Sequence, residues 1–289
     1  MRRLWLCFLL LCFPCLAATK ITPHQEWLAF REAVMFRTGG PTGAHAIQDM
    51  VELQPGEAAY LIPGKSIFDA RWSKQASKRH VARVENQDNQ AIISGPGIDR
   101  SDLMRLPDRA LQLPNKLTTR VSRLDKTALK VWLYNANLPA RKKFKGVAFY
   151  PYSPRGVVKG VFRRNEKPTA VNYLDSRDHA GVMYVVGTLE VELGGKKQTL
   201  KAYNYKDDWS ELEWILLLLK DDTSGKTSYG GGRVTEVHFP KGTPPRTMTV
   251  NLNTLYSFLC AHSDYYNCPL MLTDRVDGGL PYGEKYPPL

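Results

Sequence analysis

The run from Trp214 to Leu219 constrains the fold of this chain more than any other stretch, because it is apolar at every position. Acidic residues border the run on both sides, and about eight residues are too few to span a bilayer. We therefore expect a central β-strand that is buried on both faces. A short helix is the alternative, since leucine favours helices.

Most of the remaining chain consists of short β-like runs separated by turn residues. Before the apolar run they cover 57–62, 80–84, 91–93, 118–124 and 128–133, and around it 147–152, 157–162, 170–174, 183–193, 199–205, 229–239 and 247–252. Such spacing suggests sandwiches or barrels. The sequence therefore predicts a mainly β protein, with a small β sandwich-like domain over 46–138 and a larger β barrel or sandwich over 139–289. Gly194-Gly195 predicts a hairpin. The tail from Ser257 onward is expected to form an ordered loop.

One helix is expected before the first β domain, within residues 18–45. Thr22 is a suitable N-cap, Pro23 suits the first helical position, and Glu26 lies where a capping box requires an acid or amide. Gly39-Gly40-Pro41 should end the helix. The polar, basic segment 135–145 offers the best domain boundary.

Residues 1–17 have the layout of a secretory signal peptide. Arg2 and Arg3 precede an apolar run to Leu16, and Cys15-Leu16-Ala17 forms a small-x-small cleavage site. A buried N-terminal element and a lipoprotein anchor at Cys15 are the alternatives, both with poorer matches. We expect a periplasmic or secreted protein, cleaved near Ala17, without a transmembrane segment in its mature form.

Cleavage there would remove three of the five cysteines and leave only Cys260 and Cys268. An even pair in an oxidising compartment predicts one disulfide bond. A metal site with His262 and a reactive thiol are the alternatives. Because this spacing is not a recognised zinc pattern and a fourth ligand is missing, we expect no metal and no cofactor.

The chain contains 40 Lys and Arg against 28 Asp and Glu. A strongly basic protein suits an anionic partner such as a phospholipid surface or an acidic envelope polymer. The basic residues are dispersed, however, and no nucleic-acid-binding motif accompanies them. The expected partner is a small polar or anionic ligand or an envelope polymer, and not nucleic acid.

The sequence does not match two common catalytic motifs. Gly225-Lys226-Thr227 lacks the earlier glycine of a phosphate-binding loop, because Lys220 stands there, and neighbouring acids would repel phosphate. No Gly-x-Ser-x-Gly nucleophile elbow occurs. Ser224 or Ser228 could act with one of the histidines at 179, 238 and 262, but nothing in the sequence brings such a pair together.

The densest group of polar and glycine residues lies between Asp222 and Cys268. The ordered motifs there and nearby are Arg141-x-x-Phe144-x-Gly146-x-x-Phe149-Tyr150-Pro151, Asp222-Thr223-Ser224-Gly225, Tyr229-Gly230-Gly231-Gly232-Arg233, Asn251-Leu252-Asn253, Tyr256, Cys260-Ala261, Cys268-Pro269, Arg275 and Gly283-Glu284-Lys285. This series resembles the bacterial domain-of-unknown-function family numbered 1684, over about residues 141–285. Asn251 replaces an aspartate of the family, and Ser257-Phe258-Leu259 replaces Asn-Pro-Pro. The resemblance implies a site without naming its chemistry.

The candidate ligand-binding residues are Asp222, Tyr229, Arg233, Asn253, Tyr256 and Glu284. The favoured hypothesis is a non-catalytic binding or scaffold module of the cell envelope. The alternative is a periplasmic hydrolase that uses Asp222, Tyr229, Arg233 and Glu284, and the sequence does not decide whether the protein is an enzyme. Arg233 could instead have a purely structural role, which we call the architectural alternative. In that case it pairs internally with Asp222 or Glu284 and holds the C-terminal tail against the barrel.

Overall fold

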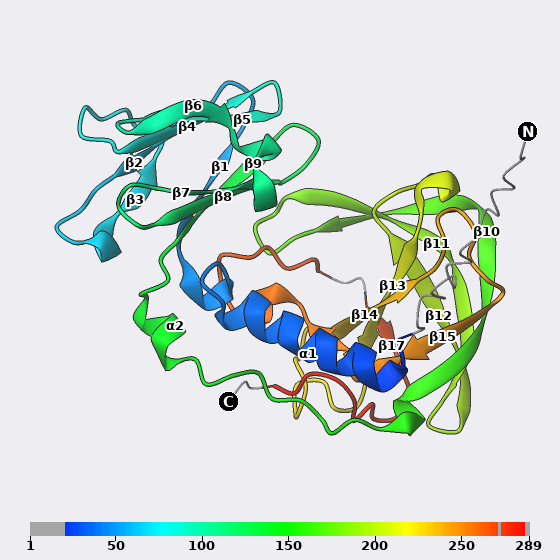
Figure 1. Ribbon diagram of the computed structural model, residues 1–289. Coiled ribbons are helices and arrows are strands. Elements are labelled where there is room, and N and C mark those ends of the chain that lie inside the picture. Colours follow the sequence, from blue (N-terminus) through cyan, green and yellow to red (C-terminus); the bar gives the residue numbers. More distant parts are fainter. Residues whose placement is uncertain (1–20, 271–272, 287–289) are drawn as a thin grey trace, which may run out of the picture.

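The computed structural model describes residues 21–270 and 273–286. Over these residues the fold is mainly β, as predicted, with one long helix and three sheets (Figure 1). Two sheets lie within residues 47–134, and an eight-stranded sheet lies within 157–275. The predicted signal peptide falls outside the described residues. In the described part of the chain, no helix combines the length and hydropathy needed to cross a membrane.

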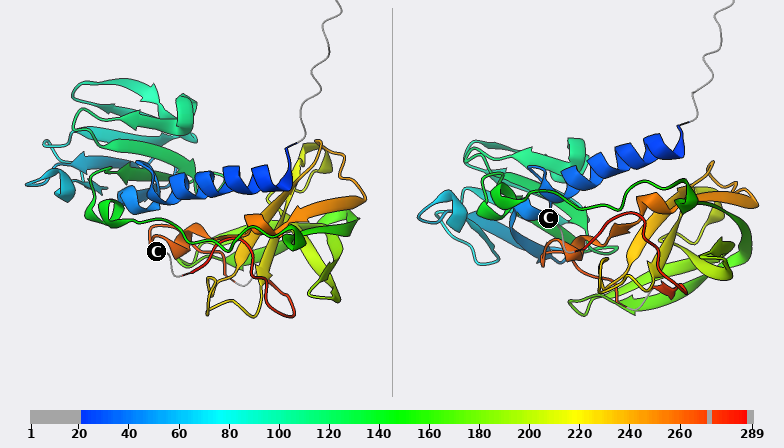
Figure 2. Two further views of the ribbon diagram at one scale, coloured as in Figure 1. Left: turned by 60° about the horizontal axis from the view of Figure 1, so that its bottom comes forward. Right: turned by 90° about the horizontal axis from the view of Figure 1, so that it is seen from below.

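Helix α1 (Pro23–Gly39) begins at the predicted N-cap, Thr22. The capping box is completed by Gln25 and not by Glu26 as expected, because Gln25 stands three residues after the cap. The helix ends at Gly39 with Gly40 as its C-cap, and it buries Trp27, Val34 and Thr38. Figures 1 and 2 show that α1 lies along the eight-stranded sheet and that its C-terminal end points toward the first two sheets.

The first two sheets pack face to face as a sandwich. The four-stranded sheet has the order β1-β9-β8-β7, with β1 Ile47–Leu53, β7 Ala110–Gln112, β8 Thr118–Arg123 and β9 Leu129–Tyr134. The five-stranded sheet has the order β3-β2-β4-β5-β6, with β2 Ala58–Ile62, β3 Arg71–Ser73, β4 Ala82–Gln87, β5 Gln90–Gly95 and β6 Ile98–Asp102. Leu61, Val84, Ile93, Val121 and Val131 belong to their shared core.

The large sheet runs in the order β15-β10-β11-β12-β13-β14-β16, and β17 pairs with β13. Its strands are β10 Val157–Leu174, β11 Ala180–Leu193, β12 Lys196–Asn204, β13 Trp214–Lys220, β14 Arg233–His238, β15 Thr247–Asn251, β16 Tyr256–Ser257 and β17 Asp274–Arg275. The sheet curls but stays open, with β15 and β16 as its edges. A closed barrel, one of the two predicted forms, is therefore wrong; a sandwich-like arrangement fits.

Strand β13 is buried on both faces, as its apolar run predicted. Ile215, Leu217 and Leu219 pack in the main core of the curled sheet. Leu216 and Leu218 point to the opposite face, into a second cluster with Met183 and Val234. The predicted hairpin at Gly194-Gly195 joins β11 to β12, and both glycines have positive φ.

Short connections complete the fold. The segment proposed as a domain boundary contains helix α2 (Pro139–Lys143), and the division into domains there stays a prediction. The 3₁₀ turns are Ala44–Ala46, Ile67–Asp69, Leu103–Arg105, Pro107–Arg109, Pro154–Gly156, Trp209–Glu211, Leu252–Thr254 and Leu259–Ala261.

Candidate functional site

Arg233, at the start of β14, is the centre of a buried polar cluster. Only 1% of its side chain is exposed, and its guanidinium pairs with Asp221 at 2.8 Å. Burial raises the pKa of the Asp221 carboxyl, but hydrogen bonds from Thr223 and the charge of Arg233 outweigh burial, so the net shift is downward. The cluster therefore holds a charged pair inside the protein.

The other donors of Arg233 hold the C-terminal tail (residues 276–286). Arg233 Nη2 donates to the carbonyl oxygen of Leu280 at 2.8 Å. Nη1 donates to the carbonyls of Tyr282 and, at 3.3 Å, Glu284. These contacts match the architectural alternative, except that the acidic partner is Asp221.

Glu284 is the second acidic residue of this cluster, and it is fully buried. Its carboxylate accepts from the backbone N–H of Ser257 at 2.9 Å and lies 2.8 Å from Nε2 of His262. From the sequence, His262 is a candidate only as a metal ligand or a base, and its contact with Glu284 is not predicted. Gly283 has φ of 70°, and a Cβ there would collide with the carbonyl of Leu255, so glycine is required for the tail to reach this place.

Two of the other candidates point away from Arg233. Asp222 is exposed, and its carboxylate accepts from Arg275 at 2.6 Å. Asn253 is buried, and its amide exchanges two hydrogen bonds of 2.9 Å with the backbone of Ser153. The structure therefore brings Arg233 and Glu284 together and leaves Asp222 and Asn253 in separate contacts.

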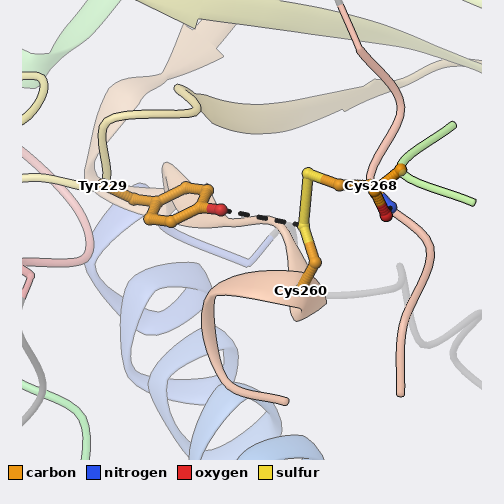
Figure 3. The surroundings of a disulfide bond; sticks show 4 residues. Tyr229, Cys260 and Cys268 are labelled. Atoms are coloured by element: carbon orange, nitrogen blue, oxygen red, sulfur yellow. Dashed lines mark hydrogen bonds between the residues drawn. A yellow bond between two sulfur atoms is a disulfide. The ribbon is translucent and has the colours of Figure 1, made fainter. Parts of the chain in front are cut away.

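Tyr229 lies against the disulfide bond (Figure 3). Cys260 and Cys268 are bonded, as predicted. The hydroxyl of Tyr229 lies 3.9 Å from Cys260 Sγ, and its ring packs edge-on against Tyr286 at 5.3 Å. The bond closes residues 260–268, and we call the slightly longer segment 259–270 the disulfide loop.

Tyr256 opens onto a cavity that sequence reasoning missed. This apolar groove has a volume of about 350 Å³. It lies between α1, strands β11, β13, β14 and β16, and the disulfide loop. Its lining consists of Arg37, Met183, Tyr205, Trp214, Leu216, Leu218, Val234, Glu236, Tyr256, Phe258, Leu259, Tyr266, Asn267 and Pro269.

A smaller and more polar cavity adjoins the apolar groove. This small chamber has a volume of about 170 Å³ and is lined by Glu26, Phe30, Ala33, Val34, Arg37, Glu236, His238, Thr254 and Tyr256. Arg37, Glu236 and Tyr256 line both cavities. They form the junction through which a ligand could contact both.

The junction combines opposite charges around one aromatic ring. The guanidinium of Arg37 stacks 4.4 Å above the ring of Tyr256, whose hydroxyl donates to Glu236 at 3.0 Å. Burial, followed by the charge of Glu236, raises the pKa of Tyr256. The phenol therefore stays protonated and able to donate. Buried Nε of Arg37 has no hydrogen-bond partner among the described residues.

Within residues 21–270 and 273–286, no group of three or more His, Cys, Asp or Glu side chains is arranged to hold a metal ion. The groove offers mainly aromatic and aliphatic surface, one guanidinium and one carboxylate. Such a lining can bind and orient a small molecule.

Comparison with known proteins agrees with the sequence resemblance. Residues 142–285 match the family described as "Protein of unknown function (DUF1684)". The C-terminal half of this chain belongs to that family. The DUF1684 segment supplies the sheet and the disulfide loop that line the apolar groove, whereas α1 and Arg37 precede it.

The other comparisons identify no protein of known activity. No curated protein matches the chain. The solution NMR structure of an uncharacterized protein of Haloarcula marismortui matches with a TM-score of 0.42 and 28% identity, over 50% of this chain and 79% of that chain.

Proposed function

We propose that this protein is a non-catalytic binding module, whose ligand is a small, largely apolar molecule held in the apolar groove. One observation carries the proposal: Arg37 stands at the junction of the two cavities with its Nε unpartnered among the described residues. A buried N–H without an acceptor is costly. An acceptor group on a ligand would remove that cost.

The lining of the groove supports a ligand with an apolar body. Trp214, Phe258 and Tyr266 contribute aromatic surface, and Leu216 and Leu218 contribute aliphatic surface. Burying apolar ligand surface contributes about 25 cal/mol per Å². A guanidinium beside such a surface adds orientation, because it prefers carboxylate and phosphate oxygens. The proposed ligand is thus more apolar than the polar or anionic molecule expected from the sequence.

The hydrolase alternative receives less support from the same geometry. The terminal nitrogens of Arg233 donate to Asp221 and to backbone carbonyls of the tail, so they are not free to hold a reacting group. Glu284 is fully buried against Ser257 and His262. These contacts favour a role of the cluster in holding the tail.

Fluorescence titration with 8-anilinonaphthalene-1-sulfonate tests the proposal, because this probe joins an aromatic body to one anionic group. The native protein should bind about one equivalent with enhanced emission. Arg37→Gln should weaken binding about tenfold or more, since a charge-assisted hydrogen bond contributes about 1.5–3 kcal/mol.

Arg31→Gln provides the matched control. Arg31 also lies on α1 and stacks on aromatic rings, those of Trp27 and Phe149, but it does not line either cavity. Its replacement should leave probe affinity unchanged, and near-UV circular dichroism should confirm that each variant is folded. Equal weakening by both substitutions, or no saturable binding to the native protein, would refute the proposed function.

We also propose that binding takes place outside the cytoplasm. The amino-terminal signal-like sequence and the disulfide bond between Cys260 and Cys268 support this location. An envelope polymer remains a less suitable partner, because a groove of about 350 Å³ fits a small molecule better than a chain.

A further inference from the structure

Within the proposed binding function, the junction between the two cavities limits the chemistry of the ligand. Arg37 and Glu236 both line the apolar groove and the small chamber, and Tyr256 lies between them. Arg37 stacks on the ring, and Glu236 accepts from the hydroxyl. A ligand at the junction therefore meets a cation and an anion at the same time.

These two charges do not neutralise each other directly. The described residues include no ion pair between Arg37 and Glu236, although Glu236 lies 3.2 Å from Nε2 of His238. About 40% of the Glu236 side chain is exposed, so its carboxylate can accept further hydrogen bonds. None of the described residues provides an acceptor for Nε of Arg37. Both charged groups can thus bind a ligand.

A ligand with a single charge would be mismatched at this junction. An anion attracted to Arg37 would be repelled by Glu236, and a cation attracted to Glu236 would be repelled by Arg37. A ligand that carries both charges a few bonds apart meets complementary groups on both sides of Tyr256.

The surroundings also define how such a ligand would be oriented. Glu26 in the small chamber adds a second carboxylate, which accepts from Asn251 Nδ2 at 2.8 Å. An ammonium group would therefore face the small chamber, near Glu236. The apolar groove on the other side of the junction would receive the side chain of the ligand, against Trp214 and Phe258.

We infer that the ligand is a zwitterion of the α-amino acid type with a large apolar or aromatic side chain, including short peptides that present such a residue. Its acidic group would bind Arg37, its ammonium group would bind Glu236, and its side chain would fill the apolar groove. This inference rests on the proposed function and adds the class of ligand.

Displacement of 8-anilinonaphthalene-1-sulfonate at pH 7 by three matched compounds tests the inference. The compounds are 2-amino-4-phenylbutanoic acid, 4-phenylbutanoic acid and 3-phenylpropylamine, which share an apolar body and differ in charge. The zwitterion should displace the probe from the native protein at concentrations at least tenfold lower than either of the others.

Two variants test which charged group of the ligand each protein side chain binds. Glu236→Gln should abolish the preference for the zwitterion over the acid, and Arg37→Gln should abolish the preference over the amine. Glu32→Gln, on α1 but outside both cavities, is the control and should keep both preferences.

The outcomes separate the inference from the proposed function. Saturable probe binding that the acid or the amine displaces as well as the zwitterion would overturn the inference and leave the binding function standing. Retained preferences in Glu236→Gln and Arg37→Gln would overturn the assignment of the charges. Absence of any saturable probe binding would overturn both proposals.

Discussion

At the scale of single residues, two arginines of this protein have different surroundings. The terminal nitrogens of Arg233 donate to Asp221 and to the tail, whereas the guanidinium of Arg37 stacks on Tyr256 at the junction of the two cavities. In both arginines, Nε has no hydrogen-bond partner among the described residues. The sequence singled out Arg233 because it follows three glycines. The sequence offers Asp222 or Glu284 as its internal partner, but adjacent residues diverge after β13: Asp221 pairs with Arg233, and Asp222 pairs with Arg275.

The first residue-scale prediction concerns Arg233→Lys. Lysine lacks the planar fork that reaches Asp221 and the tail carbonyls together, so the variant should lose about 3–5 kcal/mol of unfolding free energy. Urea denaturation measures this loss. The matched control is Arg275→Lys in the exposed pair with Asp222, which should change stability by less than about 1 kcal/mol. An Arg233 variant as stable as the control would show that the cluster is not structural.

A second residue-scale prediction concerns acid stability. The pKa of Asp221 is lowered in the folded protein, so its contribution is complete above the unfolded value of about 3.9 and is lost as pH falls through the folded value. Unfolding free energy should therefore decrease below about pH 4. Asp221→Asn should be less stable at neutral pH and should show a shallower decrease in acid. If the variant loses as much unfolding free energy below pH 4 as the native protein, Asp221 is not the group responsible for the decrease.

At the scale of elements, local sequence patterns predict the helix and the central strand correctly, but they do not predict the groove. The capping residues of α1 and the apolar run of β13 act over a few positions, and both elements form where expected. The apolar groove is assembled from α1, four strands and the disulfide loop, and its lining residues Arg37 and Pro269 are more than two hundred positions apart in the chain. No spacing rule connects Arg37 with Tyr256. The groove could therefore be found only from the fold.

The element-scale prediction concerns the disulfide loop. Replacing both cysteines with serine removes a cross-link worth about 2.5 kcal/mol by chain-entropy arguments. Because Leu259 and Tyr266 of this loop line the groove, probe affinity should fall as well. Denaturation and probe titration measure the two effects. Dithiothreitol should lower the stability and the probe affinity of the native protein, and it should change neither property in the double variant. Full probe affinity in the double variant would show that the loop does not shape the groove.

At the scale of the whole molecule, α1 and the disulfide loop connect the sandwich to the curled sheet. The hydroxyl of Tyr265 donates to the backbone of Gln48 at 2.7 Å, and Lys130 donates to Asn267 at 2.6 Å. The many short β-like runs in the sequence are sufficient to predict two β regions. It could not distinguish a closed barrel from an open curled sheet, because closure depends on whether β15 and β16 pair.

Export is the prediction that belongs to the whole chain. Amino-terminal sequencing of the protein from its native host should find a mature end near Ala18, in the periplasmic or secreted fraction. Recovery of the chain with Met1 intact from the cytoplasm would contradict both the processing and the proposed location.

The central claim is that the groove between α1 and the curled sheet is a ligand site. Amide chemical-shift mapping by NMR with 2-amino-4-phenylbutanoic acid tests this claim most directly. The account predicts saturable shifts concentrated near Arg37 in α1, in β13 and β14, and in the disulfide loop. Shifts confined to the sandwich, or no shifts at millimolar ligand, would contradict it.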